Sequence, residues 1–265
     1  MASKPNIYVP GICSVSVYPG GFVRVNRLRI PSHLGVSGGV RSNITELSKK
    51  SRDKLLFTVG ITEVRMLSMI TLTYGTLHPM DGLQAKDHLR VFLQAMRREY
   101  GLEYAWFIEF QSRGAPHFHV LCNVAEVSAF DRATMAQKWC GAVSDFVFSS
   151  AEAIGRDEVW AEGELDKMFS VHTHNRAWEN VRSEDGATRY VAKYATKTEQ
   201  KTVPKQYRNI GRFWGVSSGV RFHTKNVAKM DMSDEELRQL LEAQGHTVAE
   251  WDVIPRYIFG FKCFT

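Results

Sequence analysis

The sequence predicts an α+β fold, in one domain or in one domain with extensions. Runs of strand-forming and helix-forming residues mix along the chain without the regular strand–helix–strand rhythm of parallel α/β proteins. Hydrophobic residues make up 44% of the 265 positions, which suffices for a substantial core. Three segments are expected: a basic, strand-rich extension over residues 1–65, a main domain over residues 66–230, and a C-terminal helix with an aromatic tail over residues 231–265.

The N-terminal segment shows short β-type runs and no clear helix. Residues 7–9, 15–18 and 22–25 are rich in β-branched and aromatic side chains, and Gly20 and Gly21 form a turn signal between the last two runs. Arginine and lysine make this segment basic. We interpret it either as an accessory surface for an anionic partner or as a strand-rich lid or arm.

The main domain opens with a strand and then a helix. Residues 66–74 read as a buried strand, and residues 85–100 carry an apolar stripe at helical spacing. Gly101 is expected to end this helix. Two further strands, over residues 106–111 and 117–121, flank a turn.

The later elements differ in how clearly they are marked. A helix is predicted to begin after the capping residue Ser128 and to run to about residue 148. Residues 157–167 are acidic and ambiguous, whereas residues 169–174 read as a strand. A last helix over residues 231–245 carries a capping box, and the aromatic tail after it is expected to pack on the domain.

The hairpin over residues 106–121 is the most informative part of the sequence. A turn centred on Gly114 sets Gln111 opposite His117 and Glu109 opposite His119. Because side chains alternate along a strand, these four polar residues share one face of the hairpin. The other face, expected to meet the core, consists of Ile108, Phe110, Phe118 and Val120.

Two imidazoles and a carboxylate are a donor set that holds a metal and leaves positions open for substrate or water. His117, His119 and Glu109 are therefore the predicted metal ligands, with Gln111 as the alternative third ligand. A His-x-His pair in a strand can also be structural. The second such pair, at residues 172–174, has threonine between its histidines and is expected to lie in a strand beside the site.

A second cluster of reactive residues is predicted on a helix over residues 189–197. Tyr190 and Tyr194 lie one turn apart, and each is followed three residues later by a lysine, Lys193 or Lys197. Tyrosine is a possible covalent nucleophile, and a nearby cation favours its phenolate form. Two tyrosines four residues apart can also be a packing pair. A basic stripe runs along this helix, formed by Arg189, Lys193, Lys197 and Lys201.

Three motifs in this order resemble those of the HUH endonucleases, and among them the rolling-circle replication initiators with two catalytic tyrosines. Pro116-His117-Phe118-His119-Val120 resembles their His-hydrophobe-His motif, and Tyr190-Val-Ala-Lys193-Tyr194 resembles their tyrosine motif. Residues 67–74 resemble their threonine-rich first motif. The likeness extends to gene A-type proteins of single-stranded DNA phages and to related plasmid Rep proteins.

The resemblance implies a ferredoxin-like or palm-like antiparallel sheet with helices on one face, a central His strand and a tyrosine helix packed against it. It also implies that His117, His119 and Glu109 bind Mg²⁺ or Mn²⁺, whereas ligand softness alone favours zinc or manganese. A tyrosine would attack single-stranded DNA and leave a 5′-phosphotyrosine and a free 3′-hydroxyl. The second tyrosine would cut the regenerated origin, and the lysines would hold phosphates or favour the phenolate.

The charge distribution fits an anionic partner. The net charge is +6 and the isoelectric point about 9.1. Residues 182–229 alone contain eleven lysines and arginines against three acidic residues, interleaved with aromatic side chains as single strands prefer. The residues expected to bind DNA are Arg189, Lys201, Lys205, Arg208, Arg212 and Trp214.

Other features narrow the setting of this chemistry. Four scattered cysteines without a Cys-x-x-Cys pair indicate a reducing compartment and no zinc ribbon. The sequence shows no secretory signal, no membrane-spanning run and no Gly-x-x-x-x-Gly-Lys phosphate loop. With the resemblance, this predicts action in the cytoplasm of a bacterial host on origin single strands, hairpins included, with a separate helicase and polymerase from the host.

Two alternatives remain at this stage. The first is a relaxase or transposase of the same superfamily, although relaxases place the tyrosine before the histidines and such transposases usually have one tyrosine. The second is a non-catalytic module that binds single-stranded DNA through its aromatic and basic residues. The complete set of Glu109, His117, His119, Tyr190 and Tyr194 argues against the second alternative.

Overall fold

The predicted α+β class is confirmed. The computed structural model describes residues 12–27, 47–125, 128–174, 176–181, 191, 203–208, 210–245 and 256–260. The chain divides into two compact units, each with its own antiparallel sheet. We call Ser42–Thr224 the central unit and the pair Met1–Arg41 and Lys225–Thr265 the terminal unit.

The central unit is built on a five-stranded antiparallel sheet of order β6-β3-β5-β4-β7. Its strands are β3 (Ser68–Thr73), β4 (Tyr104–Phe110), β5 (Pro116–Cys122), β6 (Trp178–Asn180) and β7 (Trp214–Val216). The three strands predicted over residues 66–121 are thereby confirmed. The strand that carries the histidines, β5, is the central one, as the resemblance implied.

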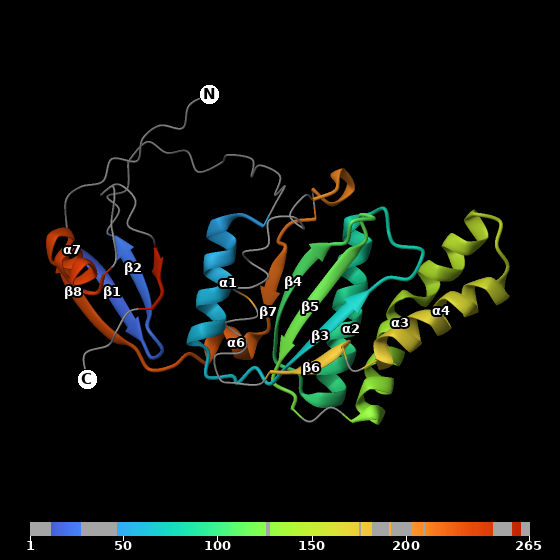
Figure 1. Ribbon diagram of the computed structural model, residues 1–265, viewed down its shortest axis with the longest axis horizontal. Helices are drawn as coiled ribbons and strands as arrows, with labels where there is room; N and C mark the ends of the chain where they lie inside the picture. The colour runs from blue at the N-terminus through green and yellow to red at the C-terminus, as the bar shows by residue number, and fades with distance from the viewer. Residues whose placement is uncertain are drawn as a thin grey trace. The chain divides into compact units, whose positions relative to one another are not determined.

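Three helices cover one face of this sheet (Figure 1). They are α2 (Gly82–Tyr100), α3 (Ala129–Ala153) and α4 (Glu158–Thr173), and α3 packs along α4. Their local signals act as predicted: Gly101 ends α2 in the left-handed conformation, and Ser128 forms a capping box with Asp131 at the start of α3. The four predicted core residues of the hairpin are at most 5% exposed on this face.

The opposite face is also covered in part, so the expectation of helices on one face only is wrong. Helices α1 (Lys49–Ile61) and α6 (Ser218–Phe222) contribute Leu55, Val59 and Val220 to an apolar cluster with residues of that face. Helix α1 was not expected from the sequence. Its buried residues at positions 55, 57, 59 and 61 repeat every two positions, which is a strand-like pattern, and packing against the sheet overrides it.

Helix α4 corrects a second expectation. Residues 169–174 were expected to form a strand, but the helix extends to Thr173 and also includes the ambiguous residues 158–167. Phe169, Val171 and Thr173 favour a strand locally. The helix instead buries Ala161, Glu164, Met168 and His172, which recur at helical spacing and pack on the sheet side.

The terminal unit joins the two ends of the chain in a sheet of order β8-β1-β2-β9. Its elements are β1 (Ile12–Tyr18), β2 (Phe22–Arg27), β8 (Ala228–Ser233), α7 (Asp234–Ala243) and β9 (Tyr257–Ile258). The hairpin at Gly20 and Gly21 and the capping box at the start of α7 are confirmed. The predicted boundaries differ from this division, because α1 belongs to the central unit and the C-terminal strands pair with the N-terminal ones.

None of the helices in the described ranges has an apolar stretch long enough to cross a bilayer. The remaining short element is a 3₁₀ turn, η1 (Lys205–Tyr207), in the segment that leads to β7. Tyr207 and Ile210 of this segment are buried against the α2 side of the sheet.

Candidate functional site

Strand β5 presents His117 and His119 on the sheet face opposite α2. The register pairs His117 with Glu109 on β4 and with Thr73 on β3. It pairs His119 with Phe107 and with Thr71 in the same way. Two imidazoles, a carboxylate and two threonine hydroxyls are therefore gathered on neighbouring positions of three strands.

The predicted pairing of the hairpin was wrong by two residues, although the predicted face is confirmed. Gly114, at φ +81°, donates its N–H to the Gln111 carbonyl at 2.8 Å, so the turn is centred on Arg113 instead of Gly114. Glu109 thus lies opposite His117 and diagonal to His119. A shift of two residues keeps every side chain on its face, which is why the grouping survives the error.

The His119 ring is held from three sides. It is 2% exposed and its Nε2 lies 3.3 Å from Oε2 of Glu109. Its Nδ1 lies 3.5 Å from the Thr71 hydroxyl, and its ring stacks on Phe107 at a centroid distance of 4.9 Å. The His117 ring meets it edge to face at 4.7 Å. These contacts fix the orientation of the ring, as is usual around functional imidazoles.

A clamp beside the turn holds the open end of the face. Gln111 donates to the Thr73 hydroxyl at 3.0 Å and accepts from Arg113 at 2.9 Å. Arg113 also donates to the carbonyl of Tyr74 at 2.7 Å and to those of the next two residues. Gln111, the alternative third ligand, is therefore engaged in fastening the hairpin turn to the end of β3.

The same face changes from polar to apolar along its strands. Beyond the histidines it carries Met69, Ala105 and Leu121, which form the cluster that α1 covers. Val191 is 1% exposed and belongs to this cluster. The described residue nearest in sequence to the predicted tyrosines thus packs on the same sheet face as His117 and His119.

The donor set on this face fits a divalent cation in type, since two imidazoles and a carboxylate meet there. As the side chains stand, no three or more His, Cys, Asp or Glu residues within the described ranges form a metal-binding group. Glu109 instead contacts the Nε2 atom of His119. Coordination by that nitrogen would replace this contact.

The described residues that were expected to bind DNA are at the surface but do not share one face. Trp214, on β7, is half-buried and lies opposite Phe107, in the row of the sheet that contains His119. The ammonium of Lys54, on α1, lies 5.9 Å from the centre of its ring. The exposed residues Lys205, Arg208 and Arg212 belong to the segment that packs on the α2 side.

The remaining predicted site residues lie outside the described residues. They are the catalytic candidates Tyr190, Lys193, Tyr194 and Lys197 and the DNA-binding candidates Arg189 and Lys201.

His172 has a structural position in the described part of the chain. It is fully buried, its Nδ1 lies 2.6 Å from the Met168 carbonyl, and its Nε2 accepts the Thr73 N–H at 3.1 Å. Burial lowers the pKa of His172 from 6.5 to about 4, so the ring is neutral near pH 7. It lies in a helix and on the far side of the sheet from His117, which corrects its expected place in a strand.

Sequence reasoning assigned no role to several residues of this face. Thr71 and Thr73 could have been found, because they alternate within a predicted strand just as His117 and His119 do. Phe107 and Lys54 could not, since their place depends on the pairing register and on how α1 packs.

The family comparison covers the elements that build this site. Residues 67–199 match the model of the replication-associated protein ORF2 family, which is half of the chain. No curated protein and no solved structure matches the chain. The matched span begins at β3 and contains the histidine hairpin, α2 to α4 and Val191. The chain therefore belongs to the replication-associated protein ORF2 family.

Proposed function

We propose that this protein nicks and rejoins single-stranded DNA at a replication origin, through a phosphotyrosine intermediate, to start and end rolling-circle replication. Its family supports a role in initiating rolling-circle replication. The observation that carries the chemistry is the group of His117, His119 and Glu109 on the central strands, oriented by Thr71 and Phe107.

The proposed reaction is a transesterification with a tyrosine as nucleophile. The phenolate oxygen of Tyr190 or Tyr194 forms a bond to the scissile phosphorus, and the bond from phosphorus to the 3′ oxygen breaks. The leaving oxygen takes a proton and becomes the free 3′-hydroxyl that primes synthesis. Because the phosphodiester is exchanged and not hydrolysed, attack by a 3′-hydroxyl on the phosphotyrosine reseals a strand without ATP.

His117, His119 and Glu109 would hold a divalent cation, Mg²⁺ or Mn²⁺. Such a cation, when bound, offsets charge on the scissile phosphate and favours in-line attack. The protein contributes orientation: the Phe107 ring and the Thr71 hydroxyl keep His119 in place, and the Gln111–Arg113 clamp keeps the hairpin turn on β3. Lys193 and Lys197 are proposed to bind phosphate or to favour the phenolate.

Two observations support bringing the tyrosines and DNA to this face. Val191 follows Tyr190 directly in the chain and is buried in the cluster beside the histidines. Trp214 and Lys54 provide an aromatic ring and a cation in the same row of the sheet, a combination that suits a base and its phosphate.

The test is a denaturing gel of the protein with labelled single-stranded origin DNA, in Mn²⁺ and in chelator. We expect a metal-dependent covalent band that disappears in the Tyr190→Phe/Tyr194→Phe double variant. Tyr257→Phe, in the terminal unit, is the matched control and should keep the band. Tight binding without a covalent band on verified origin DNA would instead identify a non-catalytic binding module.

A further inference from the structure

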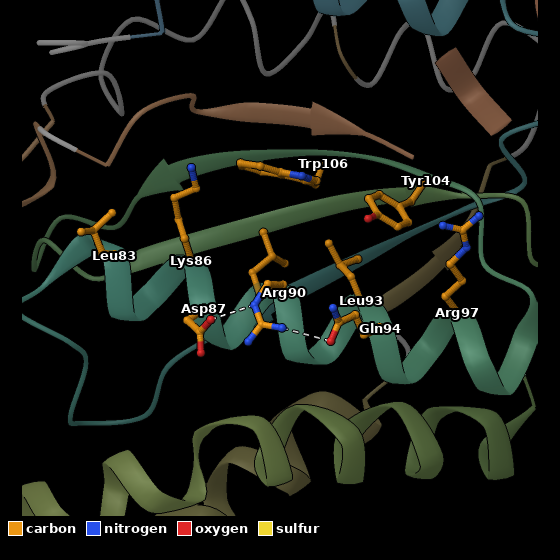
Figure 2. Close-up of a pocket in the computed structure, with 10 residues that line it drawn as sticks. Leu83, Lys86, Asp87, Arg90, Leu93, Gln94, Arg97, Tyr104 and Trp106 are labelled. Atoms are coloured by element: carbon orange, nitrogen blue, oxygen red, sulfur yellow. Dashed lines mark hydrogen bonds and ion pairs between the residues drawn. The ribbon is translucent and has the colours of Figure 1, made fainter. Parts of the chain in front are cut away.

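A second candidate site lies on the other face of the central sheet. A groove of about 500 Å³ runs between α2 and β4, on the face opposite His117 and His119 (Figure 2). Lys86, Arg90 and Arg97 line it from α2, and Tyr104 and Trp106 line it from β4. Its lining thus combines cations with aromatic rings.

Trp106 is set at the edge of the sheet by its neighbour on β7. It pairs with Gly215, and a Cβ at that glycine would lie 2.7 Å from the indole Nε1. The absence of a side chain therefore lets the indole lie directly against the β7 backbone. Trp106 remains partly exposed, and the Lys86 ammonium lies 5.7 Å from its ring centre.

The cations of the groove retain capacity for an anion. Arg90 uses two of its nitrogens on Asp87 and Gln94, and Arg97 uses one on Glu103 and Ser218. A guanidinium has five N–H donors, so both have donors to spare. These surface pairs are also weak enough to be exchanged for phosphate.

Lys86 is the most constrained of these cations. It donates to the Ile210 carbonyl at 2.8 Å, and burial and then the charge of Arg212 lower its pKa. A bound phosphate would offset both effects, because an adjacent anion favours the charged ammonium. From Lys86 to Arg97 the helix rises about 16 Å, which is the length of about five stacked nucleotides.

The sheet edge at β7 links this groove to the face of the histidines. Trp214 points to the His119 face with Lys54 above its ring, and Trp106 points to the α2 face with Lys86 beside its ring. Two aromatic–cation pairs therefore flank the same short edge strand from opposite sides. Such platforms bind single strands with little sequence preference.

We propose that the α2–β4 groove binds single-stranded DNA, with a base on Trp106 and phosphates at Lys86, Arg90 and Arg97, as a second contact for a strand that passes around the β7 edge. The identity of the strand rests on the proposed function. A duplex cannot offer an unpaired base to Trp106, and an acidic peptide has no base to stack.

The test measures binding of fluorescein-labelled dT20 to the full chain by anisotropy at several salt concentrations. Arg90→Gln should weaken binding about fivefold and lower the salt slope by about 0.7. Trp106→Leu should weaken it about tenfold, or about 1.4 kcal/mol. Arg98→Gln is the matched control, since Arg98 is exposed on the same helix but does not line the groove. It should stay within about twofold.

A second measurement does not depend on any variant folding. Photo-cross-linking of the wild-type chain to dT20 that carries 5-iodouracil, followed by peptide mapping, should recover a peptide containing Trp106. Unchanged binding by Arg90→Gln and no Trp106 cross-link would overturn the proposal. So would equal weakening for a 20-base-pair duplex, or displacement of dT20 by polyglutamate at the same charge concentration.

These outcomes separate the groove from the proposed function. Binding of dT20 needs no cleavage, so weakened binding by the groove variants in a protein that never forms a covalent band would keep the groove and reject the nickase. A normal covalent band with unaffected dT20 binding by Arg90→Gln and Trp106→Leu would do the reverse.

Discussion

Replacing His172 with glutamine is expected to remove much of the loss of stability between pH 7 and pH 5. In the folded protein the His172 Nε2 accepts the Thr73 N–H, and its Nδ1 lies within hydrogen-bond distance of the Met168 carbonyl. This geometry requires the neutral ring with its proton on Nδ1. Protonation would place a second N–H against that of Thr73, in a buried position.

The magnitude follows from the two pKa values. His172 titrates near 6.5 in the unfolded chain and near 4 in the folded one, so as the pH falls protons bind the unfolded chain first. Stability is therefore unaffected well above pH 6.5, falls as the pH drops below it, and stops falling below about pH 4. The loss from this group amounts to about 2 kcal/mol at pH 5 and about 3 kcal/mol at pH 4.

The assay is urea unfolding at pH 7 and at pH 5, followed by tryptophan fluorescence. Trp139 reports on the site, since its ring centre lies 6.3 Å from that of His172. Glutamine keeps an acceptor at the ε position and does not titrate, so the wild type should lose about 2 kcal/mol more than His172→Gln. The exposed His174→Gln is the control and should behave as wild type. Equal losses in wild type and His172→Gln would refute the reasoning.

Three further outcomes are expected. His117→Ala should abolish cleavage while single-strand binding stays within about tenfold, or about 1.4 kcal/mol, in a filter-binding assay; lost binding would make the histidine structural. Tyr190→Phe and Tyr194→Phe should each retain some first-strand cleavage on a sequencing gel, and the paired-nucleophile hypothesis fails if one change abolishes all cleavage and the other alters nothing. Gly82→Ala should lower the free energy of unfolding in urea by about 1–3 kcal/mol, because the new methyl would overlap the Ile210 side chain and lie 2.7 Å from a ring carbon of Tyr207; an unchanged midpoint would show that this contact yields.

Local signals in the sequence were reliable where they are self-contained. Gly101 ends α2, Ser128 caps α3 and the Gly20–Gly21 turn joins β1 to β2, as expected. Each depends on the conformational freedom or hydrogen bonding of one or two residues, which the rest of the protein hardly alters. Alternation along β4 and β5 was equally reliable, because the pleat fixes which side chains share a face.

The sequence was misleading where a segment could satisfy two patterns. Helix α1 and the end of α4 both contain strand-like alternation, yet both are helices. Their form is decided by the faces they bury, Leu55 and Val59 against the sheet in one case and Met168 and His172 in the other. Burial of that kind outweighs the small differences in intrinsic propensity.

The sequence by itself determined the candidate chemistry: two histidines and a glutamate on one face of a hairpin, and a basic chain with aromatic residues among its cations. Only the tertiary structure decided how these residues meet. The turn at Arg113 sets Glu109 opposite His117, and strand order brings Thr71 and Thr73 beside the histidines. It also divides two tryptophans between opposite sides of one edge strand. Parity along a strand is local, whereas register and strand order depend on contacts between distant segments, so the chain must fold before they exist.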